Sequence, residues 1–228
     1  QLEGSKTFSR NFCKRYNIPQ PSFKYCNNLK TAKERIELLN GYCVVKADGL
    51  AAGKGVVVCN TVNEAIEAST QMLEENKFGD AGKSILIEER ITGIEASVFA
   101  VSDGKTAVLL GTAQDHKRAY DNDKGPNTGG MGAISPAPAL NEELNDIIFH
   151  NIIIPTINGM RSDGTPYEGI LYAGVMLTDK GPKVIEFNCR FGDPETQVIL
   201  PRLETDLVEI VHNAVTNNLE NTCIELFD

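Results

Sequence analysis

Residues 184–196 read VIEFNCRFGDPET, a short apolar run that turns abruptly polar. If this segment is a β-strand, its side chains alternate between two faces, so Glu186, Asn188 and Arg190 project from one side. That side then carries a carboxylate, an amide oxygen and a guanidinium, about 6–7 Å apart for every two residues. The same alternation predicts that Cys189 points into the core.

Such a row of side chains suits a magnesium–phosphate site. Mg²⁺ takes one or two protein oxygens together with water and phosphate oxygens, and arginine can bind a phosphoryl group through two hydrogen bonds. The alternative is a half-buried strand whose polar face is merely solvated. These residues alone do not choose between the two.

Size and composition indicate a folded protein of one large or two small domains. The chain has 228 residues, of which 41% are hydrophobic and 23% charged, as in ordinary globular proteins. The net charge of −9 repels nucleic acid and anionic membranes, and no run approaches the ~20 apolar residues of a membrane span. Any anionic substrate therefore needs a local basic pocket.

The six cysteines include no C-x-x-C pair, and the chain shows no signal-peptide pattern. Both observations favour reduced thiols and a cytoplasmic location. The helical pattern is already present by Ser5, from which we expect a piece of a longer polypeptide.

Hydrophobic periodicity predicts an α+β fold with largely antiparallel sheets. Apolar residues at helical spacing predict helices over residues 5–16, 29–39, 61–75, 141–160 and 205–217. Alternating or β-branched runs predict strands over residues 43–46, 56–59, 84–89, 96–101, 106–111, 170–178 and 183–188. Residues 112–140 are rich in Gly, Pro, Asn and Asp, and a loop of that length is usually functional.

The loop over residues 46–55, KADGLAAGKG, joins two predicted strands. Its glycines would let the backbone approach a phosphate closely, and a lysine about 4 Å away would contribute roughly 4 kcal/mol before desolvation. The spacing is not that of a P-loop, and a strand follows where a P-loop has a helix. A flexible turn is the alternative.

Several segments taken together resemble the phosphoribosylamine–glycine ligase family, also called glycinamide ribonucleotide synthetases, of the ATP-grasp superfamily. They are VVKADGLAAGKGVVV (44–58), LIEERITGIEAS (86–97), QDHKR (114–118), GPNTGGMGAISPAP (125–138), ILYAGVML (170–177) and VIEFNCRFGDPETQ (184–197). The resemblance runs almost from end to end of the chain. It implies two subdomains that clamp ATP between antiparallel sheets.

The resemblance also implies a division of the chain. We expect residues 1–20 to hold a linking helix and the start of the core, residues 21–91 to form the lid with its Gly-rich flap, and residues 92–228 to form the catalytic subdomain. The flanking N- and C-terminal domains of the family are expected to be absent. The chain would then be a fragment, and one alternative is that it binds ATP without turnover.

The resemblance assigns nucleotide-binding, catalytic and metal-binding roles residue by residue. Lys46 and Arg190 are the predicted catalytic residues, and Glu186 and Asn188 the predicted ligands of Mg²⁺, with Mn²⁺ as the alternative metal. The predicted ATP-binding residues contact the phosphates, the adenine edge or the ribose: Lys6, Lys46, Gly49, Gly53, Lys54, Gly55, Glu88, Glu89, Ile91 and Glu95. Without the resemblance, the three glutamates would be read as a solvated strand edge.

Substrate-binding residues are predicted in three segments. Lys117 and Arg118 would supply the local positive charge that a phosphate needs, although a charge run is ordinarily a solvated face. Residues 127–132 would offer backbone N–H groups to an anion. The full predicted set is Asp115, Lys117, Arg118, Asn127, Thr128, Gly129, Gly130, Asp193, Glu195 and Thr196, the last three for the ammonium of glycine. The role of His116 is left open.

The activity that the resemblance implies is an ATP-dependent ligase. Glycine would be phosphorylated to glycyl phosphate, and 5-phosphoribosylamine would displace the phosphate to form glycinamide ribonucleotide in purine biosynthesis. The partners are thus small molecules, with no nucleic acid or membrane, and the oligomeric state is not indicated. Two alternatives remain, an ATP-grasp ligase for another carboxylate and a nucleotide-binding module without turnover.

Overall fold

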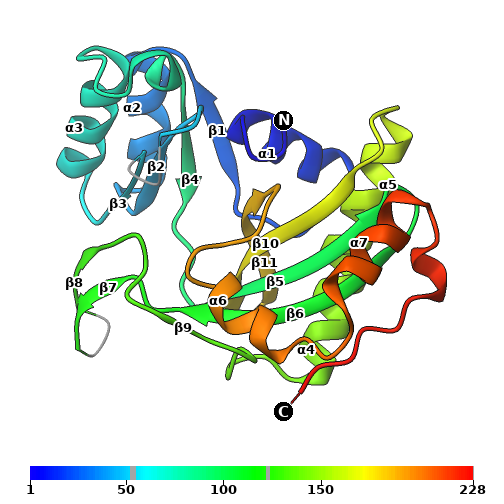
Figure 1. Cartoon of the computed structure of the whole chain (residues 1–228). Coiled ribbons are helices and arrows are strands. Elements are labelled where there is room, and N and C mark those ends of the chain that lie inside the picture. The colour runs from blue at the N-terminus through cyan, green and yellow to red at the C-terminus, as the bar shows by residue number, and fades with distance from the viewer. Residues whose placement is uncertain (52–54, 122–123, 228) are drawn as a thin grey trace. The chain divides into compact units, whose positions relative to one another are not determined.

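The computed structural model describes residues 1–51, 55–121 and 124–227. The chain forms two compact units (Figure 1), one of residues 1–14 and 20–92 and one of residues 15–19 and 93–228. The predicted flap residues Gly53 and Lys54 lie outside the described residues. None of the helices in the described parts of the chain is long and apolar enough to cross a membrane.

The first unit is built on a four-stranded antiparallel sheet with the strand order β1-β4-β2-β3. The strands are β1 (Phe23–Cys26), β2 (Cys43–Ala47), β3 (Val56–Cys59) and β4 (Ile85–Glu89). Its helices are α1 (Lys6–Arg15), α2 (Leu29–Leu38) and α3 (Val62–Leu73), with a short 3₁₀ turn, η1 (Gly79–Gly82).

Helices α2 and α3 cover one face of this sheet. Val45 and Ile87 are fully buried there against Ile36 of α2 and Met72 of α3. Alternation along the strands therefore sends the even-numbered side chains of β2 and β4 to the opposite face. That face carries Lys46 and Glu88.

Local signals determine where the two covering helices begin. Asn28 accepts a hydrogen bond from the N–H of Thr31, and Thr61 accepts one from the N–H of Glu64, so both act as N-caps. Glu64 of α3 also contacts the chain before the helix, because its carboxylate accepts from the N–H of Asn60, one residue before the cap.

The second unit contains a five-stranded antiparallel sheet with the order β11-β10-β5-β6-β9. Its strands are β5 (Ile94–Asp103), β6 (Ala107–Asp115), β9 (Ala133–Ile134), β10 (Glu168–Thr178) and β11 (Gly181–Asn188). A separate two-stranded hairpin pairs β7 (Arg118–Tyr120) with β8 (Lys124–Asn127).

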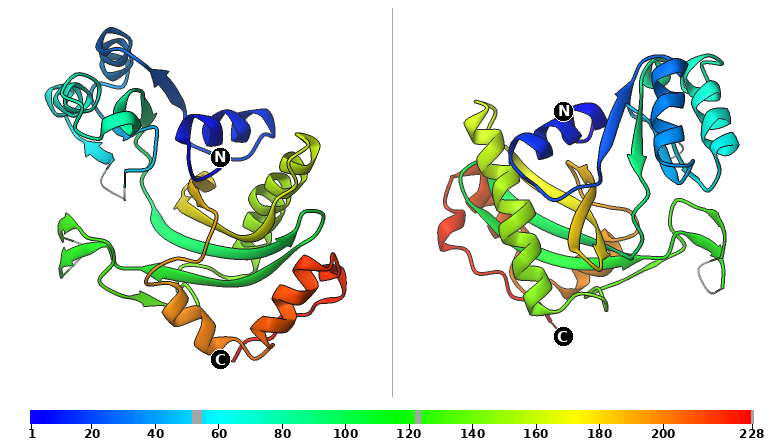
Figure 2. Two further views of the ribbon diagram at one scale, coloured as in Figure 1. Left: turned by 45° about the horizontal axis from the view of Figure 1, so that its top comes forward. Right: turned by 180° about the vertical axis from the view of Figure 1, so that it is seen from behind.

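Helices lie on both faces of this larger sheet (Figure 2), which explains why residues 96–103 of β5 are buried without alternation. One face is covered by α6 (Thr196–Ile199) and α7 (Leu207–Val215), flanked by the 3₁₀ turns η3 (Leu200–Arg202) and η4 (Leu219–Asn221). The other face is covered by α4 (Glu142–Ile148), the π-helical segment η2 (Phe149–Ile153) and α5 (Ile154–Ser162).

The predicted helices and strands are confirmed, most of them within two residues at each end, and the fold is α+β. The prediction for residues 112–140 was wrong in one respect. This segment is not a structureless loop, because β6 continues to Asp115 and three further short strands follow. Turn residues hid them, since each strand is only two to four residues long.

Candidate functional site

Lys46 of the first unit lies in a buried charge cluster, which we define as Arg10, Lys46 and Glu88. The Lys46 ammonium is 2.9 Å from Oε2 of Glu88. Arg10 of α1 binds the same carboxylate twice, through Nε to Oε1 at 2.6 Å and through a terminal nitrogen to Oε2 at 3.0 Å. The Glu88 side chain is 2% exposed and that of Lys46 is 10% exposed.

The charge cluster overturns the interpretation of Glu88 as part of a solvated strand edge. β4 is the second strand of its sheet and pairs with both β1 and β2, so Glu88 is interior. Burial by itself raises the pKa of the Glu88 carboxyl, but Arg10 and Lys46 outweigh it and hold the pKa at about 2. Glu88 is therefore ionised, and its carboxylate holds the Lys46 ammonium.

The Gly-rich loop is held at its base by the N-terminus of α1. The Lys6 ammonium donates to the carbonyls of Ala47 at 2.8 Å and Gly49 at 3.1 Å. Asp48 accepts from the N–H of Thr7 at 2.7 Å and from the hydroxyl of Ser5 at 3.1 Å. Lys6, which was predicted to contact phosphate, thus fixes the first residues of the loop.

Two glycines of this loop are required by close packing. A Cβ on Gly49 would lie 2.9 Å from Ala81, and one on Gly55 would lie 2.6 Å from the Cβ of Ala51. Neither distance is tolerated between carbon atoms, so any side chain here would displace the loop. Their first role is to let the loop pass close to Ala81 and Ala51.

The predicted ATP-binding residues Glu89 and Ile91 lie at the end of β4 and just beyond it. Glu89 donates its backbone N–H to the Ser22 carbonyl at 2.9 Å and accepts the Ser22 hydroxyl at 3.0 Å. Ile91 is half-buried and lies beyond the end of the strand.

In the second unit, the predicted metal and phosphoryl residues form one connected row. The Asn188 amide nitrogen is 3.5 Å from Oε1 of Glu186, and an Arg190 terminal nitrogen donates to Oδ1 of Asn188 at 3.3 Å. Glu186 and Arg190 are exposed and Asn188 is half-buried. Hard oxygens beside a guanidinium suit a magnesium-bound phosphate.

The row reaches this face through a β-bulge that simple alternation does not predict. Gly174 of β10 pairs with Glu186, but the next residue of β10 pairs with Val184, so Ile185 is an extra residue. Val184 is consequently buried although it has the same parity as the exposed Glu186. The bulge turns the end of β11 so that its polar residues leave the core.

The prediction that Cys189 points into the core was wrong. Strand β11 ends at Asn188 and the chain bends at the next two residues, so alternation no longer applies. Cys189 is exposed.

Lys117 lies among carboxylates. Its ammonium is 2.9 Å from Oε2 of Glu95 and 3.7 Å from Oδ1 of Asp115. Burial lowers the pKa of Lys117, but these two carboxylates raise it above its ordinary value, while burial raises the pKa of Asp115 despite the attraction of Lys117. The positive charge expected from this segment is therefore largely offset in the structure.

A small hollow in the second unit brings four predicted residues together with others that the sequence did not indicate. Glu95, Asp115, Lys117 and Glu186 line it. The additional lining residues are Ala96, Ser97, Tyr172, Gly174 and Ile185.

Glu195 is a buried carboxylate whose partners were not predicted. Its Oε1 accepts the hydroxyl of Tyr172 at 2.9 Å and that of Ser97 at 3.4 Å. Burial and the nearby Glu195 charge raise the pKa of Tyr172, so its hydroxyl stays a donor. A Cβ on Gly192 would lie 2.2 Å from Oε2 of Glu195, so position 192 has no room for a side chain. No pattern in the sequence pairs Tyr172 with Glu195.

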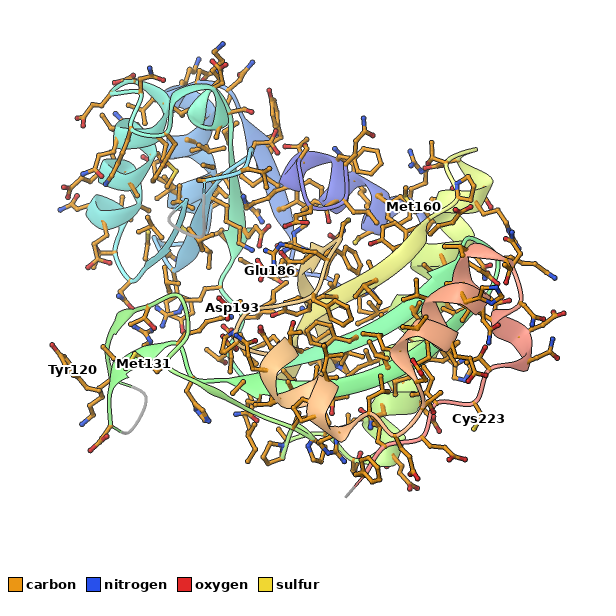
Figure 3. All side chains as sticks on the ribbon, in the orientation of Figure 1. Tyr120, Met131, Met160, Glu186, Asp193 and Cys223 are labelled. Carbon is orange, nitrogen blue, oxygen red and sulfur yellow. The ribbon has the colours of Figure 1, made fainter. Side chains whose placement is uncertain are left out.

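Two motifs that are distant in sequence meet in the second unit. A Cβ on Gly130 would lie 2.6 Å from Cδ of Pro194, so the Thr-Gly-Gly turn packs against the Asp-Pro-Glu segment. Asp193 accepts from the Gln197 amide at 2.6 Å, and the Thr196 hydroxyl donates to the Gly192 carbonyl. Figure 3 shows Asp193 before α6 and Glu186 near the end of β11.

The expectation of a cradle of exposed N–H groups over residues 127–132 was wrong for three of them. The N–H groups of Thr128 and Met131 donate to the carbonyls of Lys117 and His116. That of Gly130 donates to the Thr128 hydroxyl at 3.1 Å. The turn closes on itself because a threonine hydroxyl competes for the nearby backbone donors.

The other predicted residues of this region are at the surface or in the hairpin. Gly129 is exposed, and the Asn127 backbone pairs with that of Arg118. The Arg118 guanidinium donates to the Gly125 carbonyl at 2.8 Å. His116 is exposed, and its backbone forms the two bonds that hold residues 131–132.

Two α+β units with these sheets, one bearing a buried lysine beside a Gly-rich hairpin and the other a Glu–Asn–Arg row, define a protein of the ATP-grasp class. Comparison with known proteins agrees. The sequence model of the phosphoribosylglycinamide synthetase ATP-grasp (A) domain matches residues 4–196. The chain belongs to this family.

Named relatives extend the similarity to the whole chain. It is 50% identical to a phosphoribosylamine–glycine ligase of Mesorhizobium japonicum over 100% of its length, which is 53% of that protein. A chloroplastic ligase of the same name from Arabidopsis thaliana is 49% identical over 98% of the chain and 42% of that protein.

A solved structure gives the same result. The crystal structure of phosphoribosylamine–glycine ligase from Thermotoga maritima superposes with a TM-score of 0.87 at 34% identity, covering 95% of this chain and 55% of that one. The chain therefore spans about half the length of the relatives that it matches.

Proposed function

We propose that this chain is the nucleotide-binding and catalytic core of a phosphoribosylamine–glycine ligase. The observation that carries the proposal is the connected row of Glu186, Asn188 and Arg190. It places a carboxylate and an amide oxygen, which are suitable Mg²⁺ ligands, beside a guanidinium that can bind a phosphoryl group. The identity of about 50% with named ligases along the whole chain supports it.

The proposed reaction has two steps. The carboxylate of glycine attacks the γ-phosphorus of ATP, the bond to the β–γ bridging oxygen breaks, and ADP leaves. The amine of 5-phosphoribosylamine then attacks the carbonyl carbon of glycyl phosphate, loses a proton, and expels inorganic phosphate as the amide forms. A free carboxylate is a poor electrophile, so phosphorylation supplies the leaving group.

The residues of the chain would act mainly on charge and position. Lys46 and Arg190 would present fixed cations to the phosphate oxygens, where negative charge develops in the transition state. Glu186 and Asn188 would hold Mg²⁺, whose charge would offset the negative charge of the phosphates. We assign the lid role to residues 21–91 and the catalytic role to residues 92–228.

The charges that line the hollow of the second unit favour a cationic group over a phosphate. Glu95, Asp115 and Glu186 supply three carboxylates there and Lys117 one cation, so its formal charge is negative. We therefore propose that these carboxylates bind ribose hydroxyls or an ammonium group. Lys117 and Arg118 would bind a phosphate of the substrate only when that phosphate displaces their present partners, which are carboxylates for Lys117 and a backbone carbonyl for Arg118. All six cysteines are free of disulfides in the structure, which supports the proposed cytoplasmic location.

The test is a pair of measurements on the 228-residue chain. Calorimetry with ATP and Mg²⁺ should show saturable binding. Phosphate release should require ATP, glycine and freshly generated phosphoribosylamine together, and should yield glycinamide ribonucleotide. Absence of ATP binding would refute the proposal. Phosphate release with a carboxylate other than glycine would show that the enzyme has a different substrate.

A second candidate is a nucleotide-binding module that does not turn over. The coverage of only 53% of the Mesorhizobium relative favours it, because the remaining half of that protein can contribute to catalysis. ATP binding without phosphate release, even with both other substrates, is the outcome that distinguishes it.

A further inference from the structure

Asp48 has a carboxylate that neither the sequence patterns nor the proposed reaction uses. It directly follows β2, which ends at Ala47. Its Oδ1 accepts from the N–H of Thr7 at 2.7 Å and from the hydroxyl of Ser5 at 3.1 Å, and its Oδ2 accepts from the hydroxyl of Ser84 at 3.3 Å. Donors from two other segments of the first unit therefore meet at one side chain.

The backbone of the same residue binds the same two segments. Its N–H donates to the carbonyl of Ser84 at 3.1 Å, and its carbonyl accepts from the N–H of Lys6 at 3.0 Å. The Lys6 ammonium in turn donates to the carbonyls of the two neighbours of Asp48 in the chain. We call residues 47–49 the loop base. The loop base and the first turn of α1 thus bind each other through side chains and backbone.

Asp48 caps helix α1 from a position 41 residues further along the chain. The first N–H groups of a helix have no partner within it, and an anion beside them is stabilising. Because α1 begins at Lys6, the Thr7 N–H is one of these groups. The Ser5 hydroxyl, which donates to the Asp48 carboxylate, also accepts the N–H of Phe8 at 3.1 Å. Displacement of the Asp48 side chain would therefore disturb the first turn of α1 and the loop base together.

We propose that Asp48 is a positioning residue for the nucleotide phosphates: by joining the loop base to α1 and to Ser84, it fixes where the Gly-rich loop leaves β2 and where the Lys6 ammonium lies. The inference rests on the proposed function and on the predicted contacts of that loop and of Lys6 with the phosphates of ATP. Asp48 acts through geometry, because its own negative charge repels a phosphate at short range.

A purely structural role and a purely electrostatic role of Asp48 make different predictions. If it only stabilises the first unit, its loss lowers the melting temperature and leaves the affinity of the folded chain for ATP unchanged. If it acts on the phosphates through its charge, its removal strengthens ATP binding. If it positions the loop base, loss of its hydrogen bonds weakens ATP binding even though a negative charge is removed.

The experiment measures the affinity of the 228-residue chain for ATP with Mg²⁺ by calorimetry, and its thermal unfolding by circular dichroism. Asp48→Ala should lower ATP affinity roughly 10-fold or more, because several donors lose their acceptor and the loop base shifts. Asp48→Asn keeps an oxygen for the Thr7 N–H and supplies an amide N–H for the Ser84 hydroxyl. Its ATP affinity should stay within about 3-fold of that of the unchanged chain.

Asn28→Ala is the matched control for a loss of stability in the same unit. Asn28 caps α2 by accepting from the N–H of Thr31 at 2.9 Å, and α2 covers the face of the sheet opposite Lys46. Loss of this cap destabilises the helix. The melting temperature should therefore fall, while ATP affinity should change less than about 2-fold.

Each outcome decides the inference. A loss of ATP affinity below about 3-fold in Asp48→Ala, or a gain, would overturn it, as would an equal loss in Asn28→Ala or in Asp48→Asn. If Asp48→Ala does not fold, Ser84→Ala removes one donor and should lower ATP affinity about 2- to 5-fold, and an unchanged affinity would overturn the inference. An unchanged chain that binds no ATP contradicts the proposed function, whereas ATP binding that Asp48→Ala leaves intact contradicts only the role of Asp48.

Discussion

Substitution of Glu88 by glutamine should change how the stability of the protein depends on pH. In the folded chain the pKa of Glu88 is about 2, against an ordinary value of 4.5. The ionised carboxylate therefore stabilises the folded state fully above pH 4.5, and this stabilisation is lost as the pH falls toward 2. Glutamine has the same shape but no charge to lose.

The magnitude follows from the difference between the two pKa values. At about 1.4 kcal/mol per pH unit, it corresponds to about 3 kcal/mol of unfolding free energy at pH 7. Because the unfolded carboxylate takes up its proton first, about 2 kcal/mol of this is already lost at pH 3. The gap between the natural chain and Glu88→Gln should shrink by that amount between pH 7 and pH 3.

The assay is urea unfolding followed by circular dichroism at several pH values between 7 and 3. Other carboxylates titrate equally in both proteins, so the difference isolates Glu88. Asp80→Asn is the matched control, because Asp80 pairs with Lys83 in the same unit but is fully exposed, and exposed pairs contribute little. A difference that stays constant from pH 7 to pH 3 would refute the reasoning.

Three further outcomes can be checked directly. A thiol reagent should react rapidly with two of the six cysteines of the folded chain, the exposed Cys189 and Cys223, and with the rest only after denaturation; rapid reaction of three or more would contradict the burial. Gly130→Ala should lower stability by about 1–3 kcal/mol, because its φ is +124° and a Cβ would contact a proline ring. Gly129→Ala, with nothing within 4 Å of its Cβ, is the control and should change melting by little. Asn188→Leu should weaken the Mg²⁺ dependence of ATP binding, and an unchanged magnesium titration would remove Asn188 from the metal site.

Much of the fold was predictable because its signals are local. Helices α2 and α3 begin directly after Asn28 and Thr61, whose side chains cap them as their residue types suggest. The β-branched runs at residues 43–46 and 56–59 form strands β2 and β3, as predicted. The short strands within residues 112–140 were not predictable, because two to four residues carry too little periodicity and their pairing depends on distant partners.

The site was predictable as a set of residues but not as a set of contacts. Glu88 was expected near a nucleotide, yet nothing in the sequence brings Arg10 to it across 78 positions. Lys117 was expected to face a phosphate, and the fold places it against the carboxylates of Glu95 and Asp115. Both pairs are formed by side chains from different elements, and their energies depend on burial that only packing creates.

Motif chemistry by itself determined the family, the α+β class and the identity of the polar residues near the end of β11. Those properties depend on residue type and short spacing. The tertiary structure alone decided which of these residues touch and which face they occupy. The bulge at Ile185 turns Glu186 and Asn188 out of the core, and the fold brings Arg10 of α1 and Lys46 of β2 to the same Glu88 carboxylate. Both depend on strand register and long-range packing, which alternation along one segment cannot specify.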